Sequence, residues 1–263
     1  MGTSVIGADQ AAAIVVNEAG RSPFLFVCEH ASNFVPARLK GLGLPPEELE
    51  RHIAHDIGAE ALSRRLADAL DAPLVLQRYS RLIYDCNRPP KSPGAMPVVS
   101  ETTAIPGNQN LSDDEKAARI AEIYRPFHAR IAKLIDRRMK TLGAPVIVTI
   151  HSFTPVYKGR RRHLDFGVLH DQDARLADAI LAGASRWRDV ITRRNEPYGP
   201  ADGVCHTLNM HAGERGLPGV MLEIRNDLIA DTAGKAAWAA RLADVLEAAI
   251  LPQGGTIVYS PES

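Results

Sequence analysis

The sequence predicts an α/β domain built on a mostly parallel or mixed sheet, with helices on both faces of the sheet. Short, continuous apolar runs recur along the chain, and strands that are buried on both faces have this pattern. Longer segments between these runs have the spacing of apolar residues that is typical of helices. The alternation of the two patterns favours a single domain over residues 1–263, with residues 1–20 at its periphery.

Six segments have the composition of strands. The clearest are residues 24–28, FLFVC, and residues 145–150, PVIVTI, because they are rich in apolar, β-branched and aromatic residues. The other expected strands are residues 73–77, 81–86, 164–171 and 219–224. Their lengths are ordinary for strands of a compact domain.

Four segments have helical spacing, and a long loop precedes the second of them. Residues 112–143 begin with the strongest signal, because Ser112 is a favourable N-cap and Glu115 completes a capping box. Pro126 predicts a kink in this helix. The other expected helices are residues 45–72, broken near 55–58, and residues 173–184 and 232–250. Residues 87–110 are rich in Pro, Gly and Asn and predict a loop, and loops of this length are often functional.

Composition argues against several classes of protein. Basic and acidic residues number 31 each, so the formal net charge is zero and predicts neither a nucleic-acid partner nor a membrane-surface partner. The cysteines, Cys28, Cys86 and Cys205, are odd in number and far apart, which argues against a disulfide framework. We see no secretory signal and no apolar stretch of about 18 residues, and therefore expect a cytoplasmic protein.

Ionisable and amide side chains gather where several predicted strands end. In open α/β sheets, ligands bind beyond the carboxyl ends of the strands. The residues at these positions are Glu29, His30, Asp85, Asn87, Arg88, His151, Ser152, Glu223 and Arg225. The sequence therefore predicts a ligand site at this edge of the sheet.

The residue types at this edge suggest a metal hydrolase. A catalytic zinc ion takes three protein ligands from histidines and carboxylates and leaves a position for water. His30 and His151 provide two imidazoles, and Asp56, at the break in the helical segment, is the third candidate ligand. Asp56 has an alternative role as the cap of a helix that begins near Ile57. Zinc is expected, with manganese or cobalt as alternatives, because such sites accept several metals.

Further residues complete the hydrolase hypothesis. A carboxylate that is not a ligand can act as the general base toward water, and Glu223 fits this role. Arg81, Arg88 and Arg225 could hold an acidic substrate, since a guanidinium binds a carboxylate through two hydrogen bonds. A metal-free binding module for small carboxylates and a metal phosphohydrolase are the alternative functions. The basic run 157–163 is expected to be a solvated loop that could attract an anionic substrate.

Five motifs, taken together and in order, resemble the N-formylglutamate amidohydrolase family. They are CEHASNFVP, HDIGAEAL, SRLIYDCNRP, TIHSFTP and VMLEIRND, and the resemblance extends from about residue 23 to about residue 250. It implies a fold related to that of zinc carboxypeptidases and aspartoacylases. It also implies hydrolysis of N-formyl-L-glutamate to glutamate and formate, which belongs to histidine degradation.

The resemblance also implies roles for single residues. His30 and His151 match histidine ligands of the zinc carboxypeptidases, and Glu223 matches their general base. Asn87 and Arg88 match their pair that binds the substrate carboxylate. On this basis we expect a small N-acyl amino acid as the partner of a monomer or homodimer.

The chain departs from the carboxypeptidase pattern at the third ligand. Asn33 stands where those enzymes have a glutamate, whereas Asp56 matches an aspartate in the amidohydrolase family's own pattern. Asp56 is therefore preferred to Asn33 or Glu29 as the ligand.

The segment CEHASN also differs from the PHSG-like form of the family's main branch, which suggests a side branch with another N-acyl amino acid as substrate. Arg81 is expected to stabilise the oxyanion, and Ser152 and Arg225 to contact the substrate.

Overall fold

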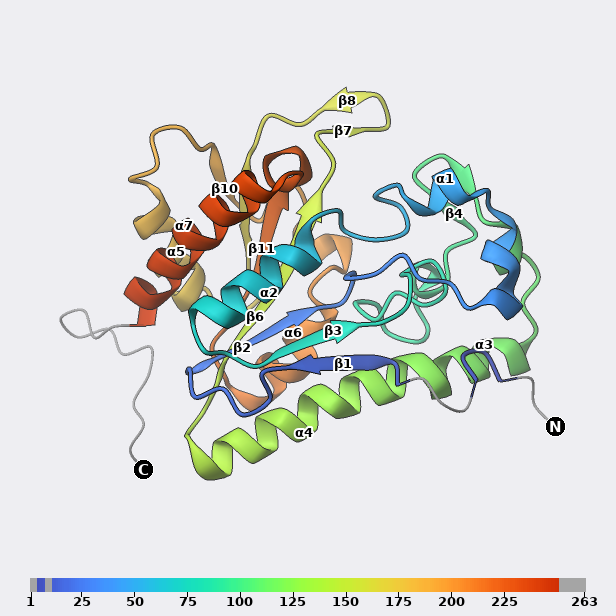
Figure 1. Cartoon of the computed structure of the whole chain (residues 1–263), viewed down its shortest axis with the longest axis horizontal. Helices are drawn as coiled ribbons and strands as arrows, with labels where there is room; N and C mark the ends of the chain where they lie inside the picture. Colours follow the sequence, from blue (N-terminus) through green and yellow to red (C-terminus); the bar gives the residue numbers. More distant parts are fainter. Residues whose placement is uncertain (1–3, 8–10, 251–263) are drawn as a thin grey trace.

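The computed structural model describes residues 4–7 and 11–250, and these form a mixed sheet with helices on both faces (Figure 1). The predicted fold class is confirmed. Seven strands make up the sheet, in the order β1-β3-β2-β6-β11-β9-β10. They are β1 (Ala13–Val16), β2 (Phe24–Cys28), β3 (Leu74–Gln77), β6 (Val146–Phe153), β9 (Phe166–Leu169), β10 (Thr192–Arg194) and β11 (Gly219–Arg225). Residues 1–3, 8–10 and 251–263, which the expected domain includes, lie outside the described residues.

The helices and short elements fill the connections between these strands. The α-helices are α1 (Pro46–Leu49), α2 (Ala59–Ala69), α3 (Asp113–Arg119), α4 (Arg125–Thr141), α5 (Arg175–Ala184), α6 (His206–His211) and α7 (Thr232–Ile250). Two small hairpins stand apart from the main sheet: β4 (Val99–Ser100) with β5 (Thr103–Ala104), and β7 (Val156–Tyr157) with β8 (Arg160–Arg161). No helix in the described ranges is both long and apolar enough to span a membrane.

The directions of the strands decide where the ionisable side chains at the strand ends meet. The central strands β3, β2, β6 and β11 are parallel, so their carboxyl ends meet at one edge of the sheet. The outer strands differ, because β1 is antiparallel to β3, and β9 is antiparallel to β11 while pairing with β10 in parallel. The sheet is therefore parallel at the centre, where strand-end residues from distant parts of the sequence meet.

The sheet is buried on both faces, which explains its continuous apolar strands. Phe24, Phe26 and Cys28 of β2 pack in the cluster formed by α2, α5 and α7. Leu25 and Val27 point the other way and pack in the cluster that includes α4 and α6. Figure 1 shows these two groups of helices on opposite sides of the sheet.

One predicted strand is wrong. Residues 81–86 form turns, in which Ile83 N donates to Ser80 O (3.0 Å) and Asp85 N donates to Ala95 O (2.8 Å). Tyr84 and its apolar neighbours are fully buried there. The apolar run thus reflects a buried loop, and apolar composition alone does not distinguish such a loop from a strand.

The predicted helices are confirmed with changes at irregular points. The capping box is present, since Ser112 Oγ accepts from Glu115 N and Glu115 Oε2 accepts from Ser112 N. A π-helical turn over Ile120–Tyr124 stands directly before Pro126, where the sequence predicts a kink. Proline lacks the N–H that a regular helix needs, and a wider turn accommodates the loss. In the segment 45–72, only α1 and α2 are helical, and residues 51–58 form turns.

Candidate metal centre and active site

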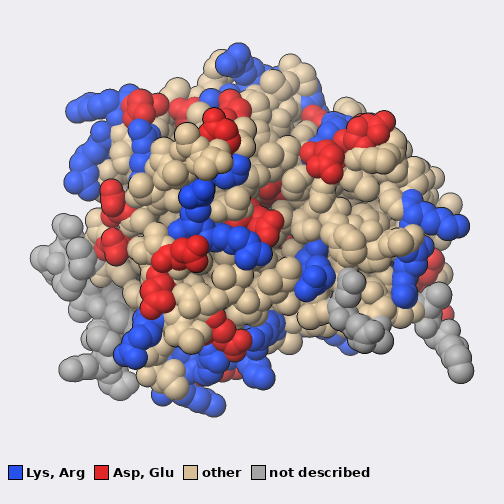
Figure 2. Space-filling view, in the orientation of Figure 1, with Lys and Arg blue, Asp and Glu red and all other residues tan. Residues whose placement is uncertain are grey.

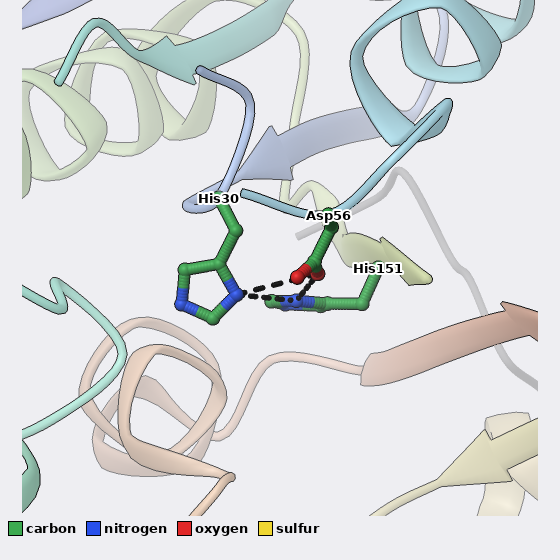
Figure 3. A group of neighbouring side chains, drawn as sticks. All are labelled: His30, Asp56 and His151. Carbon is green, nitrogen blue, oxygen red and sulfur yellow. Dashed lines mark hydrogen bonds and ion pairs between the residues drawn. The ribbon is translucent and has the colours of Figure 1, made fainter. Parts of the chain in front are cut away.

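Three buried side chains converge at the carboxyl edge of the parallel strands (Figure 3). His30 follows β2, His151 lies in the second half of β6, and Asp56 comes from the turn before α2. His30 Nδ1 is 3.2 Å from His151 Nδ1, and Asp56 Oδ2 is 3.3 Å and 2.9 Å from these two atoms. Ligands of a tetrahedral zinc ion at ordinary bond lengths are roughly 3.3 Å apart, so the trio has the spacing of a metal site.

A tight turn brings Asp56 to the two histidines. Asp56 N donates to His30 O (2.9 Å), which ties the turn to the end of β2. Gly58 follows with φ of +83°, and a Cβ at this position would lie 2.6 Å from Ile229 O. Only glycine fits both conditions, which explains the break in the helical pattern. The N-cap of α2 is Gly58 and receives no side-chain cap, so the alternative role of Asp56 as the cap is not observed.

The outer nitrogen of each imidazole lies against a further carboxylate. Asp85 Oδ1 is 2.7 Å from His30 Nε2, and Glu29 Oε2 is 3.1 Å from His151 Nε2. A carboxylate in this position favours a proton on Nε2 and leaves the Nδ1 lone pair for a cation. Histidine ligands of metals are held in this way in proteins generally, because the partner sets both the tautomer and the orientation of the ring.

The charges around the trio fit a bound cation. Burial opposes ionisation of Asp56, Asp85 and Glu29, but the neighbouring imidazoles and, for Asp85, Arg81 outweigh it. The pKa values of all three carboxyls are lowered, that of Glu29 to about 2. The three carboxylates therefore outnumber the one guanidinium beside them, that of Arg81. The Nδ1 atoms of His30 and His151 face each other at 3.2 Å, a distance that leaves room for only one proton between them. A divalent cation would satisfy both lone pairs and reduce the excess negative charge.

Arg81 connects the two aspartates. Its Nη1 lies 3.2 Å from Asp56 Oδ1, and its Nη2 lies 2.7 Å from Asp85 Oδ2. The side chain is 26% exposed and lines the cavity in front of the trio. The same guanidinium therefore fixes the carboxylates and presents part of its surface to a ligand.

Glu223 stands beside the trio on the adjacent strand. Its Cα is the register partner of His151 between β11 and β6, and the residue is 5% exposed. No described residue donates a hydrogen bond to Glu223 Oε2, although this oxygen is buried. Burial raises the pKa of the Glu223 carboxyl to about 7, since desolvation penalises its charged form. A carboxyl of this kind exchanges a proton readily near neutral pH.

A cavity of about 520 Å³ opens in front of these groups, which is ample for an acylated amino acid. The loop 87–110 contributes Ser100 and Glu101 to its wall, and the hairpin β7–β8 contributes Tyr157. On the face seen in Figure 2, acidic and basic side chains are interspersed.

Of the residues predicted to contact the substrate, Asn87, Arg88 and Ser152 line the cavity and Arg225 does not. Arg88 lines the cavity, where its Nη1 donates to Asn87 O (2.8 Å) and Gly203 O (3.0 Å). Asn87 also lines it, but its amide nitrogen donates to Val204 O and its amide oxygen accepts from Thr207 N. Asn87 therefore organises the backbone behind the cavity.

Ser152 lines the cavity as well, with Oγ donating to Ile57 O (2.8 Å) and its backbone N donating to Asp56 Oδ2 (3.3 Å). Arg225 does not line the cavity; it pairs with Asp165 (2.6 Å) and Asp227 (2.7 Å). Asn33 is also remote, because its amide donates to Glu50 at the surface.

Two features of the site are absent from the sequence prediction. Asp85 was expected at the edge of the sheet, but nothing in the sequence indicates that it contacts His30. Arg162, from the basic run 157–163, lies in the cavity wall together with Tyr198, while Arg160 and Arg161 are exposed. Arg160 and Arg161 form β8 and are both exposed, whereas Arg162 follows the strand and is half-buried, and three consecutive arginines in a sequence give no signal of this difference.

Comparisons with known proteins agree with this geometry. The sequence profile of the N-formylglutamate amidohydrolase family matches residues 22–230. An N-formylglutamate deformylase of Pseudomonas aeruginosa is 28% identical over 211 residues, which cover 70% of this chain and 74% of the relative.

Two crystal structures have the same fold. A gene product of Agrobacterium tumefaciens is 51% identical with a TM-score of 0.90, over 92% of this chain and 95% of the other. An N-formylglutamate amidohydrolase of Ralstonia eutropha is 20% identical with a TM-score of 0.66, over 91% and 97%. Because the family profile covers most of the sequence, including the residues that converge at the site, the chain belongs to the N-formylglutamate amidohydrolase family.

Proposed function

We propose that this protein is a metal-dependent amidohydrolase that cleaves the amide bond of a small N-acyl acidic amino acid. N-formyl-L-glutamate is the leading substrate, and zinc is the leading metal, with manganese or cobalt as alternatives. The observation that supports the proposal most directly is the trio of His30, Asp56 and His151 with a carboxylate behind each imidazole. Membership of the family supports amide hydrolysis and the choice of substrate.

His30, Asp56 and His151 would hold the metal through their Nδ1 and Oδ2 atoms. When bound, a divalent cation supplies Lewis-acid chemistry, since it polarises a carbonyl and makes water easier to deprotonate. Asp85 orients the His30 ring through a hydrogen bond to Nε2, and the Glu29 carboxylate lies 3.1 Å from His151 Nε2, where its charge favours a proton on that nitrogen.

Glu223 is the general base and then the general acid. It takes a proton from the attacking water, whose oxygen forms a bond to the acyl carbon. The carbon–nitrogen bond then breaks, and Glu223 returns the proton to the leaving amine. For N-formyl-L-glutamate the products are formate and glutamate. The exposed part of the Arg81 guanidinium donates to the oxyanion that forms on the acyl oxygen during this sequence.

Arg88 binds one carboxylate of the substrate. It lines the cavity, its side chain donates to the backbone oxygens of Asn87 and Gly203, and it has no ion pair with a carboxylate of the described residues, so its charge is free for a ligand. Asn87 supports it by holding the backbone at Val204 and Thr207. Ser152 forms part of the adjoining wall.

The experiment is to measure bound metal by mass spectrometry, together with formate release from N-formyl-L-glutamate, for wild type and His151→Ala. The proposal expects near-stoichiometric metal and formate release in the wild type, and loss of both in the variant. Metal without formate release would move the search to other N-acyl amino acids. No metal after reconstitution with zinc, manganese or cobalt would overturn the mechanism and favour a carboxylate-binding module.

A further inference from the structure

Arg162 is an arginine held in the cavity wall by aromatic rings. It follows β8, and its guanidinium carbon lies 4.6 Å from the ring centre of Tyr157, 4.8 Å from that of Tyr198 and 5.7 Å from that of Phe153. Its Nη2 donates to the Tyr198 hydroxyl at 2.9 Å. Stacking of this kind restrains a long, flexible side chain and is favourable for a cation. The guanidinium is therefore oriented before any ligand arrives.

The charge of Arg162 is not neutralised within the described part of the chain. Arg81, which lines the same cavity, pairs with two carboxylates. Arg162 forms no ion pair with a described carboxylate, and its second contact, from Nη1 to Thr154 O, is long at 3.5 Å. A guanidinium has five N–H donors, so several remain for a ligand. A restrained, unpaired guanidinium in a cavity is suited to bind a carboxylate through two hydrogen bonds.

Arg162 lies close enough to the metal centre to touch the same small molecule. Phe153, over which it stacks, is two residues beyond His151 on β6, so both side chains are on the same face of the strand, roughly 7 Å apart. Tyr198 and Glu223 line the same cavity, and burial together with the charge of Glu223 raises the pKa of the Tyr198 hydroxyl. The cavity is lined by Arg162, Glu223 and the trio together.

Arg88 and Arg162 come from different segments, line one cavity, and are both without a carboxylate partner among the described residues. We infer that Arg162 binds the second carboxylate of the substrate, and that it thereby selects dicarboxylic N-acyl amino acids over neutral ones. The inference rests on the proposed function for the substrate class, and it adds the residue that determines specificity.

The test compares Arg162→Met with Arg161→Met, which removes the same charge from the neighbouring, exposed position. Each variant and the wild type are assayed with N-formyl-L-glutamate and with N-formyl-L-glutamine, which has the same shape and a neutral side chain. Arg162→Met should lower kcat/KM for the acidic substrate on the order of 10- to 100-fold and change that for the amide by less than about 3-fold. Arg161→Met should leave both within about 3-fold of wild type.

An equal loss on both substrates, or no loss on either, would overturn the inference. Arg162→Lys provides a check on folding, because it keeps the charge without the two-pronged geometry and should fall between wild type and Arg162→Met on the acidic substrate only.

A binding measurement separates this inference from the proposed function. Calorimetric titration with L-glutamate and L-glutamine needs no catalysis, so it applies even if the wild type releases no formate. Preferential binding of glutamate that is lost in Arg162→Met and kept in Arg161→Met supports Arg162 as the carboxylate site. Identical binding of glutamate and glutamine by all three proteins would show that Arg162 is not the carboxylate site, whatever the outcome of the activity assay.

Discussion

Glu223 and His151 are register partners on adjacent parallel strands, so the buried carboxyl of β11 lies next to the β6 imidazole of the trio His30, Asp56 and His151. Parallel pairing holds this relationship through backbone hydrogen bonds on both sides of β6. A base held by a central strand keeps its position relative to the ligands, whereas a loop would allow it to move. The reaction proposed here depends on that fixed spacing.

Replacement of Glu223 by Gln should lower formate release on the order of 10²- to 10⁴-fold, because the amide keeps the shape of the side chain and cannot take a proton. The metal content should stay at the wild-type level, since Glu223 is not one of the trio. Turnover and metal are measured on the same sample. Wild-type turnover in this variant would exclude Glu223 as the base.

Replacement of Asp85 by Asn should weaken metal binding on the order of 10- to 100-fold, because the amide orients His30 less strongly through Nε2. Competition with a chelator measures the affinity. Asp227→Asn is the matched control, since Asp227 also pairs with an arginine but lies away from the trio. If the two variants bind metal equally well, Asp85 has no part in holding the ligand.

Replacement of Gly58 by Ala should reduce the free energy of unfolding by about 2–5 kcal/mol. This range combines the cost of a left-handed residue with that of overpacking against Ile229 O. Gly216→Ala is the control, because Gly216 also has a positive φ of +64° but no atom within 4 Å of the added Cβ. It should cost about 1–2 kcal/mol. Urea denaturation of both variants measures the difference, and equal losses would show that contact with Ile229 is unimportant.

The buried pair His128 and His211 should make stability depend on pH. Burial lowers their pKa values to about 4 and about 3, below the value of about 6.5 expected in the unfolded chain. His128 Nε2 donates to Cys86 O, so its Nδ1 accepts from His211 Nε2, and no described residue accepts a proton from His211 Nδ1. Protonation therefore has no favourable partner in the folded state.

Because the unfolded chain binds these protons first, the contribution is fully present above pH 6.5. It is lost as the pH falls from 6.5 towards 4, at about 1 kcal/mol per pH unit for each histidine. The free energy of unfolding is compared between pH 7.5 and pH 5 for wild type and His211→Gln. The variant should lose less stability over this interval. An equal or greater loss in the variant would contradict the assignment.

Much of the site is predictable because it depends on local pattern. His30 and His151 end strongly apolar segments, and parallel strands bring such ends together. Asp56 stands at a break in a helical pattern, and Gly58 explains the break through its backbone conformation. Glu223 follows a run of apolar residues in its strand. In each case, one feature of a short segment indicates both the element and the unusual residue within it.

The remainder depends on contacts between distant segments. Residues 81–86 are apolar because their loop is buried, so they resemble a strand, and the contact of Asp85 with His30 follows from that tertiary packing. The edge strand β1 forms because it pairs with β3, and no local pattern in the sequence predicts this pairing. Arg162 is distinguished from Arg161 by the direction of its side chain and by its aromatic contacts, one of which, Tyr198, is more than 30 residues away in the sequence.

The convergence of His30, Asp56 and His151 also has a consequence for chain topology. His30 and His151 are separated by 121 positions in the sequence, yet their Nδ1 atoms are 3.2 Å apart. An ion bound between them would act as a cross-link that closes a long loop, and a cross-link of this kind stabilises the folded chain more when the loop that it closes is longer. Metal binding and folding would then be linked equilibria, so a bound ion would also stabilise the folded chain by joining the ends of two strands of the parallel sheet.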